Sequence, residues 1–307
     1  MFGFEKHQLI VIGGGPAGLT AGMYAASLKI DTLIIEGTAK PRLALAEIIN
    51  NYPGFTEPIS GVELLGKMRE HALKMGAKIV KSDVISTQLS SNPKMLTTRE
   101  NKIYSADAVI IATGLQQQSL RIKNEQKLTG RGVSYCAVCD GPLFAGKTVA
   151  LVGSGEALLE EAERLSGIVG KLYVIQVPPE TVESERIMSI SGKIELVEKA
   201  IPVEILGDEY VTGLKISVNG TEELLEVGGV FIATEKIPTA KLLENSGVKT
   251  DARGCIIVDK DQRTSVEGVY AAGDCTCRGL QVVTAAGDAA VAAINASVYI
   301  RRKVRGV

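Results

Sequence analysis

The sequence of 307 residues contains no tryptophan, only two histidines and only five cysteines. Five cysteines are too few for the disulfide framework that stabilises small secreted proteins. The formal net charge of −1 provides no overall basic field, so the composition argues against a protein that binds nucleic acid or an acidic membrane surface. Glycine, by contrast, is abundant with 33 residues, and several of these glycines stand in a regular spacing.

Apolar residues make up 45% of the chain and charged residues 22%, which is typical of a soluble globular protein of about two domains. The segment Leu9–Leu28 has no charge and is long enough to cross a membrane or to act as a signal sequence. Four glycines and a proline lie within Gly13–Gly18, however, and only a strand, a turn and a helix use that cluster. We therefore expect no membrane segment and a cytoplasmic protein.

The first glycine cluster follows the apolar run Leu9–Ile12 and has the spacing G-x-G-x-x-G, at Gly13, Gly15 and Gly18. In a dinucleotide-binding fold the first glycine permits a tight turn, the second lets the backbone approach a pyrophosphate, and the third lets the helix pack closely on the strand. The N–H groups at the start of the helix then face the phosphates. A second apolar run ends in Glu36, 23 residues after Gly13, where an acid accepts a ribose hydroxyl. Together these features predict a nucleotide site.

The second glycine cluster, at Gly153 and Gly155, follows an apolar run over residues 148–152 and predicts a second nucleotide-binding fold. Its third small position is occupied by Leu158, which would hinder close packing of the helix on the strand. The next apolar run ends in Gln176, with neither an acid to hold a ribose diol nor an arginine cluster to hold a 2′-phosphate. We expect this domain to have the architecture of a nucleotide-binding domain but not the residues that bind NADPH. Whether it binds NADH or no nucleotide stays open.

The segment SYCAVCDG places Cys136 and Cys139 on either side of two residues, directly before Asp140. A tetrahedral zinc site needs four ligands, and the other cysteines and both histidines lie far away in the sequence, so we predict no metal. A purely structural disulfide here would close too short a loop to constrain the unfolded chain. A redox-active dithiol fits best, because one thiol of such motifs commonly reacts as a thiolate. Asp140 is either a proton shuttle for this pair or an ordinary turn residue.

These motifs, in this order, resemble those of the low-molecular-weight thioredoxin reductases over essentially the whole chain. Each segment alone is of modest specificity, whereas their order and spacing together are highly specific. The segments are GGGPAGLTA (Gly13–Ala21), NYPGF (Asn51–Phe55), IIATG (Ile110–Gly114), GVSYCAVCDGPLFAGK (Gly132–Lys147), RTSVEGVYAAGDC (Arg263–Cys275) and QVVTAAGDAAVAA (Gln281–Ala293).

The resemblance implies an α/β protein with two Rossmann-like, three-layer ββα nucleotide-binding domains, one inserted in the other. Residues 1–114 and 241–307 would form an FAD-binding domain, and residues 115–240 an inserted NAD(P)-binding-like domain that carries the two cysteines. The family also implies a homodimer. The resemblance implies that Asp274 binds the ribityl and phosphate region of the flavin and that Gln281 approaches the flavin ring. The full set of residues implied to bind FAD is Gly13, Gly15, Pro16, Ala17, Gly18, Glu36, Arg42, Asn51, Thr113, Gly114, Asp274, Gln281 and Val282.

The chain also departs from the usual family pattern. NADPH-dependent relatives usually carry His-Arg-Arg at the place of Gln176–Pro178, Gly-Gly at the place of Lys40 and Pro41, and glycine at the place of Glu235. This pattern is similar to archaeal and anaerobic branches of the family that do not draw on NADPH. We therefore expect the electron donor to be reduced deazaflavin, ferredoxin or NADH.

The implied reaction passes two electrons from a donor through FAD and the Cys136–Cys139 disulfide to a thioredoxin-like protein. Cys139 would lie nearer the flavin, and the segments near Gly114 and Thr239 would be hinges that carry the cysteine pair from flavin to partner. Two other functions fit the same motifs: an oxidase of small-molecule dithiols, and a non-catalytic flavin protein that senses redox state.

Three further cysteines, Cys255, Cys275 and Cys277, are expected to be unpaired thiols, since a disulfide between Cys275 and Cys277 would be strained. The pair Asn219–Gly220 stands between two alternating runs and predicts a β-hairpin. The basic C-terminal segment IRRKVRG is expected to be solvated surface.

Overall fold

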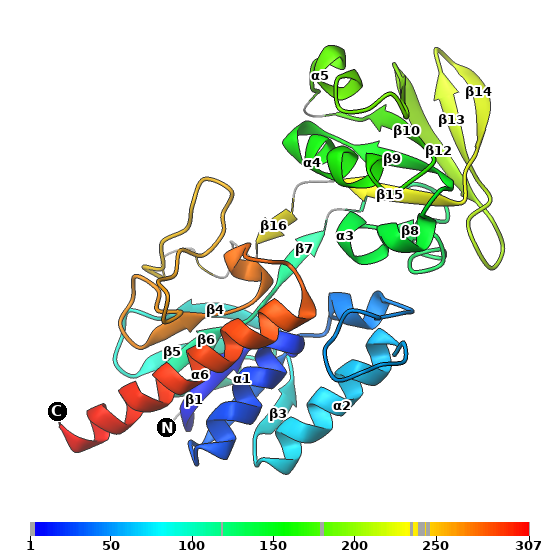
Figure 1. Cartoon of the computed structure of the whole chain (residues 1–307). Coiled ribbons are helices and arrows are strands. Elements are labelled where there is room, and N and C mark those ends of the chain that lie inside the picture. Colours follow the sequence, from blue (N-terminus) through cyan, green and yellow to red (C-terminus); the bar gives the residue numbers. More distant parts are fainter. Residues whose placement is uncertain are drawn as a thin grey trace. The chain divides into compact units, whose positions relative to one another are not determined.

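The computed structural model describes residues 4–117, 119–178, 181–233, 236–238, 243 and 246–306. The chain separates into two compact units, Met1–Gln116 with Ile237–Val307 (unit 1) and Gln117–Lys236 (unit 2) (Figure 1). The chain passes between the units through the short strands β7 (Leu115–Gln117) and β16 (Lys236–Pro238), which pair with each other. Of the two predicted hinges, Gly114 directly precedes β7 with a φ of +68°, and Thr239 lies outside the described residues.

Unit 1 is built on a seven-stranded sheet in the order β3-β2-β1-β6-β5-β4, with β17 paired to β6 as well. Strands β1, β2, β3, β6 and β17 run parallel, whereas β4 and β5 form an antiparallel extension. The strands are β1 (Glu5–Ile12), β2 (Thr32–Glu36), β3 (Lys78–Lys81), β4 (Val84–Gln88), β5 (Lys94–Thr98), β6 (Ile103–Ile111) and β17 (Val269–Ala271). The helices are α1 (Pro16–Ser27), α2 (Gly61–Lys74) and α6 (Val282–Arg305), with short 3-10 turns η1 (Arg42–Leu45) and η4 (Asp274–Thr276).

The uncharged segment near the N-terminus folds as a strand, a turn and a helix. Its apolar run Leu9–Ile12 is fully buried, because β1 is a central parallel strand with β2 on one side and β6 on the other. Strand β1 ends at Ile12, and α1 begins at Pro16, whose missing N–H costs nothing in the first turn of a helix. The prediction of a strand, a turn and a helix over this segment is confirmed.

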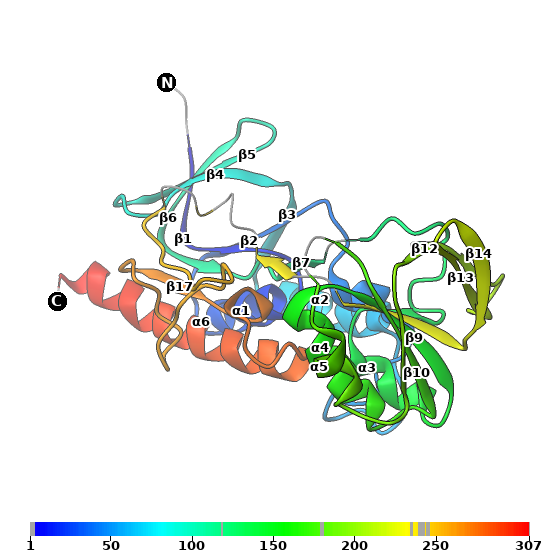
Figure 2. The same cartoon turned by 90° about the horizontal axis from the view of Figure 1, so that it is seen from above.

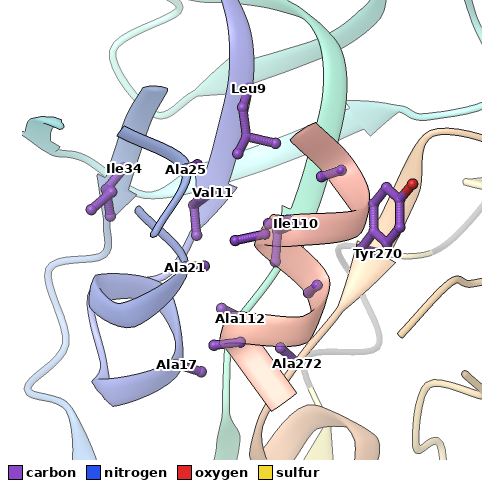
Figure 3. Close-up of a cluster of buried hydrophobic side chains, with 14 of the residues drawn as sticks. Leu9, Val11, Ala17, Ala21, Ala25, Ile34, Ile110, Ala112, Tyr270 and Ala272 are labelled. Carbon is purple, nitrogen blue, oxygen red and sulfur yellow. The ribbon is translucent and has the colours of Figure 1, made fainter. Parts of the chain in front are cut away.

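Helices α1 and α6 pack together on one face of this sheet. Figure 3 shows them side by side, with Ala17, Ala21 and Ala25 on α1 and with Val11 and Ile110 on the strands beneath. Small residues on both helices let the two backbones approach closely over the strands. Helix α6 contributes Ala285, Ala289, Ala292, Ala293 and Ala296 to the same buried cluster. Among the described helices, α6 is the one whose length and apolar composition would suffice to cross a membrane.

Unit 2 contains a parallel sheet in the order β11-β10-β9-β15-β8 and a separate antiparallel sheet β12-β13-β14, which lies beside β10 in both views (Figures 1 and 2). Its strands are β8 (Val133–Ser134), β9 (Thr148–Gly153), β10 (Lys171–Gln176), β11 (Ile194–Val197), β12 (Ala200–Leu206), β13 (Gly213–Val218), β14 (Thr221–Glu226) and β15 (Gly229–Ala233). Its helices are α3 (Ala137–Asp140), α4 (Gly155–Ser166) and α5 (Ser184–Met188), with the 3-10 turn η2 (Gly141–Phe144). The predicted hairpin at Asn219–Gly220 joins β13 to β14, and both residues take the positive φ that its turn requires.

Candidate functional site

The glycine loop of unit 1 is tightly packed against its own backbone. Gly13 has a φ of +120°, and a Cβ added there would lie 2.2 Å from the carbonyl oxygen of Ala112. A Cβ added to Gly18 would lie 1.8 Å from the carbonyl oxygen of Gly13. Glycine is therefore required at both positions by sterics alone, as expected for a loop that turns directly from a strand into a helix.

Gly15, at the start of α1, is the exception in this loop. A Cβ added to Gly15 would meet no protein atom within 4 Å, and its φ of −79° suits any residue. The space above Gly15 is therefore open, at the end of a helix whose first N–H groups favour an anion. Open space beside Gly15 fits the pyrophosphate of a dinucleotide, because in such sites the pyrophosphate lies close to the backbone of this glycine.

The other residues implied to bind FAD gather at the same edge of the sheet. Glu36 ends β2, Thr113 and Gly114 follow β6, and Asp274 follows β17. Since these strands are parallel to β1, their carboxyl ends lie at one edge, together with the loop before α1. The segment ahead of Asp274 also contacts this loop, because a Cβ on Gly273 would lie 2.8 Å from the Cβ of Ala17. Pro16 and Ala17 form the first turn of α1.

Two polar pairs join segments that are more than 200 residues apart in the sequence. Arg42 in η1 donates from Nη1 to Oδ2 of Asp274 at 3.0 Å, and both side chains are mostly buried. Asn51 donates from Nδ2 to Oε1 of Gln281 at 3.1 Å. Gln281 is also the N-cap of α6, where it forms a reciprocal capping box with Thr284, and Val282 is the first residue of that helix. The structure thus brings together four of the residues predicted from the resemblance.

Glu36 has a partner that the sequence did not reveal. Its carboxylate accepts a charge-assisted hydrogen bond from Arg69 of α2, and the Glu36 side chain is mostly buried. Arg69 stands 33 residues further along the chain in an ordinary amphipathic helix, so no local signal marks it. The pair fixes the direction of the Glu36 side chain at the end of β2.

In unit 2, Cys136 and Cys139 form a disulfide with their Cα atoms 5.3 Å apart. Cys136 caps the short helix α3, and the backbone N–H of Cys139 donates to the Cys136 sulfur at 3.2 Å. Both cysteines are partly exposed, and Val138 between them is half exposed. The cysteine segment is therefore partly open to solvent.

Asp140 is tied to the cysteine pair through Ser134, which the sequence analysis did not single out. The Ser134 hydroxyl donates to Oδ2 of Asp140 at 2.6 Å and accepts from the backbone N–H of Cys136 at 3.1 Å. Asp140 is partly buried rather than fully solvated. Its carboxylate is thus connected through the Ser134 hydroxyl to the backbone of the first cysteine.

Two more carboxylates hold the cysteine segment from neighbouring elements. Glu161 of α4 is buried; it accepts from the backbone N–H of Ala137 at 2.8 Å and pairs with Arg164 at 2.8 Å. Glu125 accepts from the Tyr135 hydroxyl at 2.5 Å, and burial is the main reason why the pKa of Tyr135 is raised. These contacts involve residues directly beside Cys136 and fix the backbone on both sides of it.

Side chains beside the second glycine loop already have hydrogen-bond partners within unit 2. Glu156 in the first turn of α4 pairs with Arg186 of α5 through two hydrogen bonds of 3.0 and 3.3 Å. The Gln176 amide accepts from the N–H of Val182 at 2.7 Å and donates to the carbonyl of the same residue at 3.0 Å. Leu158 is fully buried in the core of unit 2. Glu235, also singled out in the sequence, lies outside the described residues.

The prediction that Cys255 and Cys277 are unpaired thiols is wrong. They form a disulfide with Cα atoms 5.7 Å apart, because the segment after Cys255 runs beside the segment that ends in Cys277. Only Cys275 remains a free thiol among the described residues. Burial raises the pKa of Cys275 to about 12, so it stays protonated and unreactive. Pairing across 22 residues could not be deduced from the spacing of cysteines alone.

Comparison with known proteins agrees with this architecture. A family model described as pyridine nucleotide-disulphide oxidoreductase matches residues 7–290. The chain belongs to this family. The thioredoxin reductase of Aquifex aeolicus is 36% identical, covering 97% of this chain and 95% of its own length.

Two solved structures extend the comparison. The thioredoxin reductase of Giardia duodenalis has a TM-score of 0.89 and 33% identity, covering 97% of this chain and 99% of its own. A ferredoxin-flavin thioredoxin reductase from Clostridium acetobutylicum has a TM-score of 0.54 and 34% identity, covering 99% of this chain and 100% of its own. The predicted α/β fold with two Rossmann-like domains, the resemblance to low-molecular-weight thioredoxin reductases and FAD as cofactor are confirmed, and the chain is an FAD-dependent oxidoreductase.

The open space above Gly15 leads to a direct test of the FAD site. We expect Gly15→Ala to weaken FAD binding by ~10-fold or more, because the added methyl group takes space that the cofactor needs. The free energy of unfolding of the apoprotein should change by less than ~0.5 kcal/mol, since the methyl group meets no protein atom. FAD affinity is measured by flavin fluorescence and stability by urea unfolding. The control Gly66→Ala, on the exposed surface of α2, should leave FAD affinity unchanged; an equal loss there, or none at Gly15, would contradict this site.

Proposed function

We propose that the protein is a thioredoxin reductase, which reduces the disulfide of a thioredoxin-like protein through Cys136 and Cys139. The observation that carries the proposal is the partly exposed Cys136–Cys139 disulfide with Asp140 held beside it. The relatives support thioredoxin as the partner, because proteins similar to this chain over nearly its whole length are thioredoxin reductases. The residues at the carboxyl ends of β1, β2, β6 and β17 would hold FAD.

The chain's own residues supply the exchange steps. FAD, when bound, provides an electron pair from its reduced flavin ring. Once Cys136 and Cys139 are a dithiol, the Cys136 thiolate attacks the partner's disulfide, and Cys139 then attacks the mixed disulfide and releases the reduced partner. Asp140 carries a proton to or from the cysteine pair, and Ser134 orients it by a 2.6 Å hydrogen bond. Glu161 fixes the backbone at Ala137 throughout.

The donor that we propose is not NADPH. A ribose or 2′-phosphate needs an acid or an arginine after β10, and the Gln176 amide there is bonded to Val182. A pyrophosphate would have to approach the first turn of α4 against the carboxylate of Glu156. The candidate donors are reduced deazaflavin, ferredoxin and NADH; the first two need neither contact, whereas NADH carries the same ribose and pyrophosphate as NADPH. Ferredoxin is favoured by the name of the Clostridium acetobutylicum relative.

The partner can be tested without knowing the donor. The FAD-loaded protein is reduced by light in the absence of oxygen, and an oxidised thioredoxin-like protein is then added. We expect the partner to gain two thiols, counted by mass spectrometry after alkylation, while the flavin regains its yellow colour. Alkylation of a thioredoxin-like protein whose cysteines are replaced by serine provides the control.

The same assay separates the two alternative functions. A dithiol oxidase would leave thioredoxin-like proteins oxidised and would consume oxygen rapidly with a small dithiol. A non-catalytic sensor would transfer electrons to neither. Either result would refute the reductase proposal.

A homodimer is proposed from the resemblance, and the surface of unit 1 supports it. Helix α6 exposes an apolar stripe of Val283, Val291, Ile294 and Val298 beside a groove of about 360 Å³ between α1, α2 and α6. We expect sedimentation to give a dimer, and Ile294→Glu to give a monomer that still binds FAD. The cytoplasm is the proposed location, because a dithiol cycle needs a reducing compartment.

A further inference from the structure

The second disulfide, Cys255–Cys277, lies within the part of unit 1 that is proposed to hold FAD. Cys277 directly ends the 3-10 turn that begins with Asp274, and its N–H donates to the Asp274 carbonyl at 2.8 Å. Four residues after Cys277 comes Gln281, the N-cap of α6. The segment 277–281 therefore begins three residues after Asp274 and ends at Gln281, both of which are proposed FAD residues, and the disulfide is attached at its first residue.

This segment has a backbone that needs external support. Cys277, Gly279 and Leu280 all take positive φ, at 56°, 67° and 50°. Two of them are not glycine, and the left-handed conformation is unfavourable for residues with a Cβ. Such a conformation persists only where surrounding contacts hold it.

The start of this segment is supported by the neighbouring residues 255–258, and its end by the contacts of Gln281 with Asn51 and Thr284. The backbone N–H of Ile256 donates to the carbonyl of Cys275 at 2.9 Å, and Arg278 Nη2 donates to the carbonyl of Val258 at 2.9 Å. The Cys255–Cys277 disulfide is a covalent link between the same two segments of chain, residues 255–258 and 275–278. Cys255 itself is held by a turn in which the Asp251 carboxylate accepts from the N–H of Cys255 at 2.9 Å.

The two sulfurs differ in access. Cys255 is buried, at 3% exposed, whereas Cys277 is partly exposed at the surface of unit 1. A thiolate from a dithiol can therefore attack the Cys277 sulfur, and the Cys255 sulfur leaves as a thiolate that takes up a proton. The second thiol of the reductant then attacks the mixed disulfide and releases the Cys277 thiol. The reductant becomes a disulfide, and the protein gains two thiols and two electrons.

We propose that Cys255–Cys277 is a second redox site, at which a protein dithiol of the thioredoxin type opens the disulfide and thereby loosens the hold on FAD. This inference rests on the proposed function, because the reductant is the product of that reaction. Accumulated reduced product would open the disulfide, free the segment 277–281 and speed the release of FAD. Exchange with an oxidised partner reverses the step.

The test uses the FAD-loaded Cys136→Ser/Cys139→Ser variant, which keeps Cys255–Cys277 and cannot pass electrons from a dithiol back to the flavin. It is incubated with dithiothreitol or with a reduced thioredoxin-like protein in the absence of oxygen. We expect alkylation of both Cys255 and Cys277, detected by mass spectrometry, and a rate of FAD release that rises roughly tenfold or more, followed by flavin fluorescence after dilution. A disulfide that resists both dithiols, or that opens without faster FAD release, overturns the proposal.

A second variant serves as the control. With Cys255→Ser and Cys277→Ser added to the same background, FAD release should be fast from the start and should not respond to either dithiol. Should this variant fail to fold, the first experiment still decides, because it uses the native Cys255–Cys277 pair. Failure of the proposed function is a separate result: FAD-loaded wild-type protein that cannot reduce a thioredoxin-like protein would still show dithiothreitol-controlled FAD release.

Discussion

Cys139→Ser should lower the rate at which a thioredoxin-like protein is reduced by ~10³-fold or more, because no dithiol can then form at this position. Cys136→Ser should cause a loss of the same size, and the double variant should be no worse than either single one, since the two sulfurs act as one unit. The rate is measured as thiols gained by the partner after light reduction of the flavin. FAD affinity should be unchanged, because the cysteines lie in unit 2 and the proposed FAD residues in unit 1.

The matched control is Val138→Ala, between the two cysteines. Val138 is half exposed, and the backbone hydrogen bonds of α3 do not depend on its side chain. We expect less than a ~3-fold change in rate. A Cys139→Ser protein that retains the wild-type rate would show that another group reduces the partner, and the reductase proposal would be lost.

NADPH should bleach the flavin at least ~10²-fold more slowly than reduced ferredoxin or reduced deazaflavin offered at the same concentration. Two side chains beside the second glycine loop already have partners within unit 2. Glu156 pairs with Arg186, and Gln176 pairs with the backbone of Val182. NADPH would have to displace these contacts, and directly after β10 the chain has Gln176–Pro178 and no arginine cluster for the 2′-phosphate.

The donor comparison is made by stopped-flow absorbance in the absence of oxygen, with NADH as a further arm. Light reduction of the same sample serves as the control, because it establishes that the bound flavin can be reduced. Rapid bleaching by micromolar NADPH would contradict the interpretation of the second glycine loop, while leaving the role of the cysteines untouched.

The sequence predicted the fold because its signals are local or short-ranged. The spacing of Gly13, Gly15 and Gly18 and the buried run before them fix a strand, a tight turn and a helix, whatever the rest of the chain does. The Cys136–Cys139 pair is equally local, with a single turn of helix joining its two members. Such features can be identified from a short stretch of sequence.

The parts that were missed depend on contacts between distant segments. The partner of Glu36 is Arg69, and nothing near either residue shows that β2 and α2 place them together. The disulfide between Cys255 and Cys277 depends on the path of two loops around β17, which no spacing rule predicts. Ser134 and Glu161 hold the redox pair from a neighbouring strand and helix, and both are ordinary residues in sequence.

The central claim is that the Cys136–Cys139 disulfide and FAD share electrons within one protein, and a reductive titration tests it most directly. Wild-type protein and the Cys136→Ser/Cys139→Ser variant, both loaded with FAD, are titrated with dithionite in the absence of oxygen, and the cysteines are alkylated at the end. Because Cys255–Cys277 is present in both proteins, it cancels in the comparison. We predict that the wild type accepts one electron pair more per chain than the variant, with new thiols at Cys136 and Cys139. Equal uptake by the two proteins, with Cys136–Cys139 still oxidised when the flavin is fully bleached, would contradict the account.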